Sequence, residues 1–394
     1  MESQFDLVVI GGGPGGYGAA LYATSAGLKV ALVEKDRVGG TCLNRGCIPA
    51  KAFLETAAVH RHVAHAGDFG IQAGAPVIDF AVAQQRKQRI VDGIVKSLGG
   101  FMASKKITIL PGVGSLGHGR TVTVEAPDGS RSSITGTHVL LASGSVPRTI
   151  PGFEPTGPRS AVMTSDEVLM LDRVPGRVAV IGGGAIGCEF ASTFADLGAS
   201  VTILEGLPKI LPGLDADVAN VVVRSFKKKG IDIRTGARVE GHAPSTTASG
   251  DPMTTIRYTV DGGASEHLEV DAVIVSIGRR PFADQLGLTD TAVATDPRGF
   301  VVVDEFCRTG EPGVYAIGDL IDTPALAHVG YAEAILVVKH LLGESPTPIA
   351  YDRVPWAIYC HPEVAFAGPG EEAARAAGHE VVVAKHQFRA NSRA

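Results

Sequence analysis

Cysteine and tryptophan are scarce in this chain of 394 residues, which holds 5 cysteines and 1 tryptophan. So few cysteines exclude a disulfide-stapled scaffold, because such scaffolds are small and cysteine-dense. Long apolar runs are also missing, and none approaches the ~20 residues that a membrane-spanning helix needs. The N-terminus lacks the basic region and longer apolar run of a signal sequence, so we expect a cytoplasmic protein that does not engage a membrane.

An excess of positive charge is absent as well, since 36 lysine and arginine residues stand against 41 acidic residues. A nucleic-acid partner is therefore not favoured. Hydrophobic residues make up 45% of the chain, enough for large packed cores, and the length predicts two or three domains. Glycine, in contrast, is abundant at 50 residues and is partly organised into motifs.

One glycine pattern occurs twice along the chain. Each copy has an apolar strand, a G-x-G-x-x-G turn, an alanine-rich helical stretch and a second strand that ends in glutamate. The middle glycine precedes that glutamate by 21 residues in both copies (13 to 34 and 184 to 205). The residues concerned are Gly11, Gly13, Gly16 and Glu34 in the first copy, and Gly182, Gly184, Gly187 and Glu205 in the second.

This pattern is the fingerprint of a dinucleotide-binding βαβ unit. The glycines permit a tight turn, close approach of the backbone to a pyrophosphate, and close packing of helix on strand. The helix N-terminus favours the phosphates, and the glutamate can accept hydrogen bonds from ribose hydroxyls. Two copies predict two dinucleotides rather than two empty glycine-rich turns. Glu205, with no arginine pair after it, predicts NAD rather than NADP in the second unit.

A thiol pair, Cys42 and Cys47, follows the first unit in the stretch GGTCLNRGCIPAK. Helical periodicity begins near Pro49, so Cys47 is expected near a helix N-terminus, where the dipole lowers the pKa of a thiol. A pair of buried structural cysteines is one interpretation. A zinc site lacks further ligands at suitable spacing, so we expect no metal. A redox-active disulfide beside a cofactor is favoured, because disulfides in a reducing compartment are usually catalytic or regulatory.

These motifs resemble those of the two-cysteine flavoprotein disulfide reductases, and most closely those of the dihydrolipoamide dehydrogenases. GGTCLNRGCIPAK is close to their redox signature, although Ala50 stands where serine is more common. The resemblance continues through TSDEVLMLDRVPGRVAVIGGGAIGCEFA, VSIGRRPFADQLGL, TGEPGVYAIGDLIDTPALAH and VPWAIYCHPEVAFAG. It implies an α/β fold with two Rossmann-like dinucleotide-binding domains and the start of an α+β interface domain.

The implied domains are an FAD-binding domain at residues 1–148, an NAD-binding domain at 149–275, a return to the FAD side at 276–345 and a partial interface domain at 346–394. The resemblance assigns catalysis to Cys42, Cys47, Lys51 and Glu189. It assigns FAD contacts to Gly11, Gly13, Gly16, Glu34, Lys35, Gly40, Thr41, Lys51, Gly114, Gly144, Asp319, Ala327 and His328. It assigns NAD contacts to Gly182, Gly184, Gly187, Glu205 and Gly278.

The implied reaction is oxidation of a protein-bound dihydrolipoyl group. A substrate thiolate attacks Cys42, Cys47 passes the electrons to FAD, and NAD+ receives the hydride. The implied partner is the lipoyl group of a 2-oxoacid dehydrogenase or glycine cleavage complex, and the implied assembly is a homodimer.

The family also supplies a histidine–glutamate base from a C-terminal H-x-H-P-T-like motif, which has no counterpart before this chain ends in QFRANSRA. We therefore expect a C-terminally truncated chain with weakened dimerisation and impaired lipoamide turnover. His361, in CHPEV, matches the start of the interface domain, and we expect it to be structural. Three alternatives stay open: a glutathione- or mercuric-reductase-like enzyme, a non-thiol flavin oxidoreductase such as an NADH oxidase, and a non-catalytic or diaphorase-only fragment.

Overall fold

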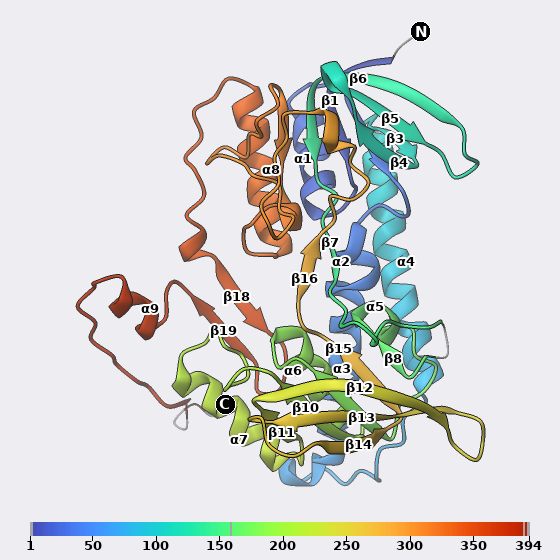
Figure 1. Ribbon diagram of the computed structural model, residues 1–394, viewed down its shortest axis with the longest axis vertical. Helices are drawn as coiled ribbons and strands as arrows, with labels where there is room; N and C mark the ends of the chain where they lie inside the picture. Colours follow the sequence, from blue (N-terminus) through green and yellow to red (C-terminus); the bar gives the residue numbers. More distant parts are fainter. Residues whose placement is uncertain (1–2, 158–159, 389–390, 392–394) are drawn as a thin grey trace.

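The computed structural model describes residues 3–157, 160–388 and 391. The two glycine-motif units form separate sheets at opposite ends of the molecule (Figure 1). The α/β fold class is therefore as predicted. The domains predicted at 1–148, 149–275 and 346–394 include a few residues, 1–2, 158–159, 389–390 and 392–394, that lie outside the described part of the chain.

The first sheet has the strand order β3-β2-β1-β6-β5-β4, and one further strand, β17, pairs with β6. Strands β3, β2, β1, β6 and β17 are parallel to one another, whereas β5 pairs antiparallel with β6 and β4 pairs antiparallel with β5. The strands are β1 (Ser3–Ile10), β2 (Val30–Glu34), β3 (Thr108–Pro111), β4 (Val113–Leu116), β5 (Thr121–Glu125), β6 (Arg131–Leu141) and β17 (Val314–Ala316). Leu7, Val8 and Val9 of β1 have no exposed surface, as expected of a parallel strand covered on both faces.

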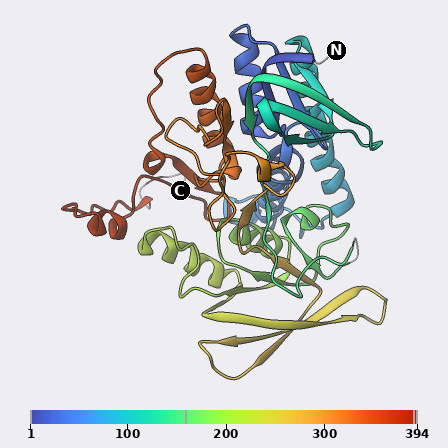
Figure 2. The ribbon, with the colours of Figure 1, turned by 45° about the horizontal axis from the view of Figure 1, so that its top comes forward.

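The second sheet is parallel throughout and has the order β11-β10-β9-β15-β8. Its strands are β8 (Val162–Met163), β9 (Arg177–Ile181), β10 (Ser200–Glu205), β11 (Asp232–Thr235) and β15 (Ala272–Val275). An antiparallel sheet of β12 (Ala237–Thr246), β13 (Pro252–Val260) and β14 (Glu266–Val270) lies at the outer end of this half (Figure 2). In both sheets the glycine turn follows an inner strand, β1 or β9, that has parallel neighbours on both sides, at the point where the strand order reverses.

Helices connect and cover the sheets. They are α1 (Pro14–Ser25), α2 (Gly40–Arg45), α3 (Cys47–Ala64), α4 (Phe80–Ser104), α5 (Ser165–Val168), α6 (Ala185–Asp196), α7 (Ala216–Lys228), α8 (Ala327–Leu341) and α9 (Glu371–Ala376). Short 3₁₀ helices are η1 (Ala66–Phe69), η2 (His118–Arg120), η3 (Leu288–Asp290), η4 (Gly318–Leu320) and η5 (Tyr351–Arg353). Among the described residues no helix combines the length and the apolar character needed to cross a bilayer.

Two antiparallel strand pairs complete the fold. Strands β7 (Ser145–Pro147) and β16 (Arg279–Pro281) pair in the middle of the molecule and run between the two halves (Figure 1). Strands β18 (Pro355–Ile358) and β19 (Val364–Ala367) form a hairpin on one side, and α9 projects from the body beyond it (Figures 1 and 2).

The thiol-bearing segment is more helical than its sequence predicts. Helix α3 begins at Cys47, two residues before the expected start near Pro49, and the short helix α2 precedes it. Gly39, which caps α2, has a φ of 101°, a backbone conformation that favours glycine. The glycines at the ends of α2 therefore allow two helices where spacing alone indicates one.

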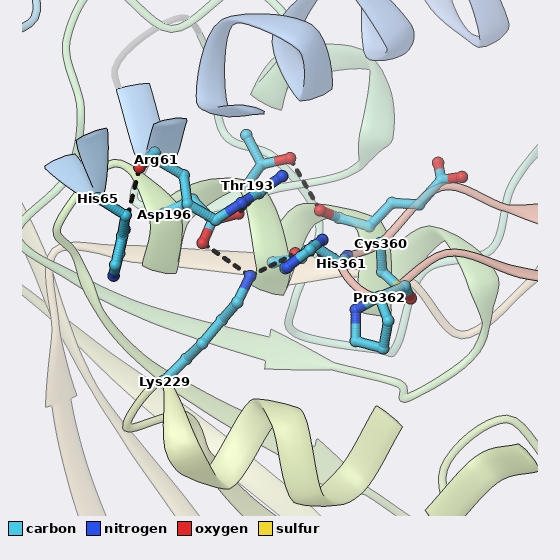
Figure 3. A network of polar contacts seen from close by, with 10 residues as sticks. Arg61, His65, Thr193, Asp196, Lys229, Cys360, His361 and Pro362 are labelled. Atoms are coloured by element: carbon cyan, nitrogen blue, oxygen red, sulfur yellow. Dashed lines mark hydrogen bonds and ion pairs between the residues drawn. The ribbon is translucent and has the colours of Figure 1, made fainter. Parts of the chain in front are cut away.

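A buried charge network joins helices of the two halves (Figure 3). Asp196, the last residue of α6, pairs with Arg61 of α3 and accepts a hydrogen bond of 2.7 Å from Lys229. The His361 backbone N–H donates to Ser192 Oγ at 2.9 Å. Burial, together with the Arg61 and Lys229 cations, lowers the pKa of His361 to about 4. Its ring is therefore neutral at physiological pH and adds no further charge to the network.

Removing the Asp196 carboxylate should destabilise the protein. In Asp196→Ala, two largely buried cations lose their shared partner, a change that typically costs about 3 kcal/mol. We expect the midpoint of thermal unfolding to fall by several degrees. Asp172→Ala is the control, because the Asp172 side chain is 86% exposed and 3.9 Å from Arg173. Equal midpoints for the two variants would contradict the importance of the network.

Candidate active site

The two glycine turns have nearly the same geometry. Gly11 and Gly182 adopt φ values of 105° and 104°, which side chains other than that of glycine rarely accept. A Cβ on Gly16 would lie 1.8 Å from the Gly11 carbonyl oxygen, and one on Gly187 would lie 1.9 Å from the Gly182 carbonyl oxygen. The third glycine of each motif therefore serves close packing of the helix on its own turn.

Each helix after a glycine turn presents an uncapped N-terminus. Gly13 and Gly184 occupy the N-cap positions of α1 and α6, and neither helix has a side-chain cap. No atom would lie within 4 Å of a Cβ built on either glycine. Free N–H groups facing open space at the positive end of a helix dipole fit a pyrophosphate.

The glutamates that end β2 and β10 are held in the same way. Glu34 Oε2 accepts a hydrogen bond of 2.6 Å from Gly12 N, and Glu205 Oε2 accepts one of 2.5 Å from Gly183 N. The second oxygen of each accepts a backbone N–H two residues further along. Burial raises the pKa of Glu34, and the Gly12 N–H partly offsets this. Since a carboxylate has about four acceptor positions, each can still receive a ribose hydroxyl.

Cys42 lies in α2, and Cys47 is the first residue of α3. The Cys42 side chain is half-buried, and Cys47 is exposed but faces the cavity described below. A hydrogen bond from the Cys42 thiol lowers the pKa of Cys47 to about 7, and the same contact raises the pKa of Cys42. The Lys51 ammonium also lowers the pKa of Cys47, whereas burial of Cys47 raises it and so opposes both the hydrogen bond and the ammonium. The negative charge of the reduced pair therefore resides on Cys47.

Lys51 stands one helical turn after Cys47 on α3 and bridges to the second unit. Its Nζ lies 3.0 Å from both carboxylate oxygens of Glu189 on α6. The Glu189 residue is only 9% exposed, so the ammonium is the partner that makes its burial tolerable. The predicted Lys51–Glu189 pair thus joins the thiol-bearing helix to the helix of the second glycine motif.

Asp319 belongs to a cluster that sequence reasoning missed in part. Its Oδ2 accepts a hydrogen bond of 2.6 Å from Ser145 Oγ, which in turn accepts one of 2.7 Å from Arg279 Nε. Ser145 and Arg279 stand in β7 and β16, the pair that runs between the sheets. Their only sequence signal is their place next to Gly144 and Gly278, just beyond the carboxyl ends of β6 and β15.

One large cavity of about 1100 Å³ connects these groups. It exceeds the ~300–1,000 Å³ of ordinary small-molecule pockets. The predicted site residues on its wall are Gly11, Gly13, Glu34, Lys35, Gly40, Thr41, Cys42, Cys47, Lys51, Gly114, Gly144, Gly182, Gly184, Glu189, Glu205, Gly278, Asp319 and Ala327.

Three predicted site residues are placed differently. Gly16 and Gly187 lie behind their turns and are not on the cavity wall. His328 is exposed, and its Nε2 donates a hydrogen bond of 2.9 Å to the Pro355 carbonyl, the first residue of β18. The cavity, with its two uncapped helix N-termini, fits two dinucleotides, and Cys47 and Lys51 lie on its wall.

Comparisons with known proteins show the family of this chain. Residues 5–334 match the profile of the pyridine nucleotide-disulphide oxidoreductase family, and residues 354–394 match its dimerisation domain. The chain therefore belongs to the pyridine nucleotide-disulphide oxidoreductases. The predictions of an FAD- and NAD-dependent oxidoreductase and of the family are confirmed.

Curated relatives are similar over the whole chain. Dihydrolipoyl dehydrogenases of Chlorobaculum tepidum and Bacillus subtilis are 39% and 38% identical to it, and that of Trypanosoma brucei brucei is 40% identical. Each alignment covers 100% of this chain and 82–83% of the relative.

Solved structures give the same fold. LpdA from Mycobacterium tuberculosis superimposes with a TM-score of 0.86 at 27% identity, covering 95% of this chain and 80% of that one. The HOCl-induced flavoprotein disulfide reductase RclA from Escherichia coli gives a TM-score of 0.80 at 28% identity, with the same coverage.

The reduced thiol pair should show two distinct reactivities. Because the thiolate is the nucleophile, alkylation of Cys47 by iodoacetamide should rise through pH ~7, whereas Cys42 should stay unreactive to much higher pH. Below pH 7 the Cys47 thiol is protonated and its labelling slows. Mass spectrometry of each cysteine against pH measures this difference. Buried Cys307 provides the internal control, and faster labelling of Cys42 than of Cys47 would contradict the assignment.

Proposed function

We propose that this chain oxidises a dihydrolipoyl group to the cyclic disulfide, with NAD+ as final acceptor. The observation that carries the proposal is the Cys42–Cys47 pair, with its low-pKa Cys47, on the wall of a cavity shared by both dinucleotide motifs. The curated relatives named above are dihydrolipoyl dehydrogenases, which supports this choice of substrate.

The proposed chemistry starts from the oxidised pair. A substrate thiolate attacks Cys42 Sγ, a substrate–Cys42 bond forms, and the Cys42–Cys47 bond breaks to release Cys47 as a thiolate. The low pKa of Cys47 makes its sulfur the better leaving group. The second substrate thiol then attacks the substrate sulfur that is bonded to Cys42. The substrate leaves as the cyclic disulfide, and the Cys42 sulfur is released. Because its pKa is raised, Cys42 takes up a proton.

Other residues of the chain hold and tune this centre. The Lys51 ammonium stabilises the Cys47 thiolate, and Glu189 balances the Lys51 charge. Gly13 and Glu34 would hold the adenosine half of FAD, Asp319 its ribityl-phosphate side, and Gly184 and Glu205 would hold NAD. When bound, FAD and NAD+ supply the two-electron acceptors that return the dithiol to the disulfide.

The proposal also covers the oligomeric state of the protein, its partner complex and its cellular location. The segment that matches the dimerisation domain supports a homodimer. We assign the lipoyl group to a 2-oxoacid dehydrogenase or glycine cleavage complex and the protein to the cytoplasm. Division of the chain into an FAD domain, an NAD domain, a returning segment and an interface segment belongs to this proposal as well.

Loss of the Cys47 sulfur should separate the thiol reaction from nicotinamide oxidation. Cys47→Ser should lower dihydrolipoamide:NAD+ turnover by more than ~1,000-fold, because the covalent route is lost. Oxidation of NADH by an artificial dye acceptor should persist. Cys307→Ala is the matched control and should keep both activities.

Full dihydrolipoamide turnover by Cys47→Ser would refute the mechanism. Turnover of glutathione disulfide but not of dihydrolipoamide by the unaltered protein would instead favour the glutathione-reductase-like alternative.

The charge of Glu205 should set the preference for NAD over NADP. Glu205→Gln keeps the shape of the side chain but removes the negative charge that repels a 2′-phosphate. We expect the ratio of kcat/KM for NADH to that for NADPH to fall by about 10-fold, a change of ~1.4 kcal/mol. Initial rates with the dye acceptor measure this ratio. Glu240→Gln, remote from both glycine turns in the sequence, is the control, and an unchanged ratio in Glu205→Gln would remove the role of this charge.

A further inference from the structure

Strand β18 lies within the segment that matches the dimerisation domain. This strand and the residues just after it form hydrogen bonds with α8 and α6 of the same chain. His328 Nε2 donates to the Pro355 carbonyl at 2.9 Å, and the Tyr359 backbone N–H donates to Glu189 Oε1 at 2.9 Å. The third contact is the His361 N–H to Ser192 Oγ bond described above. Of these three hydrogen bonds, the one from Tyr359 is accepted by the Glu189 carboxylate, which pairs with Lys51.

The side chain of Tyr359 reaches the other member of that ion pair. Lys51 Nζ lies 4.7 Å from the centroid of the Tyr359 ring, within the ~6 Å over which a ring face attracts a cation. The ammonium therefore has a carboxylate from α6 and an aromatic face from the end of β18. Both limit where the Lys51 charge can lie relative to Cys47.

We propose that Tyr359 is a positioning residue whose ring holds the Lys51 ammonium beside the Cys47 sulfur, so that the dimerisation segment completes the redox centre of its own chain. The inference rests on the role in thiolate stabilisation that the proposed function gives to Lys51. It adds a residue outside the redox signature and both glycine motifs.

The backbone and the ring of Tyr359 make separable contributions. The N–H to Glu189 is a backbone group, which any residue except proline supplies at position 359. The Tyr359 residue is 44% exposed, so its ring does not fill the hydrophobic core. A substitution at position 359 therefore removes the contact with Lys51 and leaves the contact with Glu189 in place.

Several other charged or titratable groups act on the thiol pair from neighbouring elements. Those that influence Cys47, or are influenced by it, are Tyr17 on α1, Cys42 on α2, Lys51 on α3, Asp319 on η4 and Tyr331 on α8. Asp319 opposes ionisation of Cys47, and Lys51 favours it. Lys51 is the only cation among these five residues. Moving the Lys51 ammonium away from Cys47 must therefore raise the pKa of Cys47.

The test is the pH profile of Cys47 alkylation in the dithiothreitol-reduced full chain with its bound flavin. We expect Tyr359→Leu to move the midpoint upward by about 0.5 pH unit, the size expected for loss of one partly exposed cation–π contact. Tyr359→Phe keeps the ring and should retain the midpoint of the unaltered protein. Tyr359→Met, also without a ring, should behave like Tyr359→Leu, and its thermal midpoint and flavin content report whether the fold is kept.

A second background tests whether the effect passes through Lys51. In a Lys51→Met protein, adding Tyr359→Leu should produce no further shift, because residues that act through one contact are not additive. An unshifted midpoint in Tyr359→Leu and Tyr359→Met would overturn the inference. So would a shift of equal size in the Lys51→Met background, or one in Tyr359→Phe as large as that in Tyr359→Leu.

The alkylation readout does not depend on substrate turnover. A protein that shows the Tyr359-dependent midpoint but does not oxidise dihydrolipoamide would refute the proposed function alone. A protein that oxidises dihydrolipoamide normally and shows no such dependence would refute the role of Tyr359 alone.

Discussion

The packing of α3 against α6, with an ion pair toward each end, is the constraint on which the site depends. Lys51 pairs with Glu189 at one end, and Arg61 pairs with Asp196 at the other. Helix α3 begins with the reactive thiol, and α6 begins at the second glycine turn. Since the side chains of Glu189, Arg61 and Asp196 are largely buried, sliding or separating the helices would leave buried charges without partners. The helix pair thus fixes the distance between the thiol centre and the second dinucleotide turn.

Duplication explains how the remaining parts meet. Both units place a glycine turn, a helix N-terminus and a strand-end glutamate at the carboxyl edge of a parallel sheet, where the strand order reverses. This edge is where ligands bind in open α/β sheets. The β7–β16 pair spans the two halves, so both edges open onto one cavity. Two binding motifs that share one cavity would hold two bound dinucleotides in the same space.

Electrostatics divides the work between the two sulfurs. Cys47 lies at a helix N-terminus, accepts a hydrogen bond from Cys42 and faces the Lys51 cation, whereas Cys42 is the donor of that hydrogen bond. The pKa values of two neighbouring, chemically identical groups are therefore driven apart. Such a separation is how one pair can supply both an electrophilic sulfur for the substrate and a stable thiolate as leaving group.

Local sequence was sufficient to predict two dinucleotide-binding βαβ units, with their glycine turns and glutamates, and the thiol pair, because each depends on spacing within about 30 residues and on the special backbone of glycine. The full fold class was implied by the family resemblance. The Lys51–Glu189 pair was inferred from family resemblance alone, since 138 residues separate its members. Nothing in the sequence pointed to Arg61–Asp196 or to the Tyr359 ring over Lys51. Ser145 and Arg279 beside Asp319 had only their place next to Gly144 and Gly278 as a signal. These side chains carry no periodic or spaced signal, because their partners are brought to them only when the two sheets and the β18 hairpin pack together.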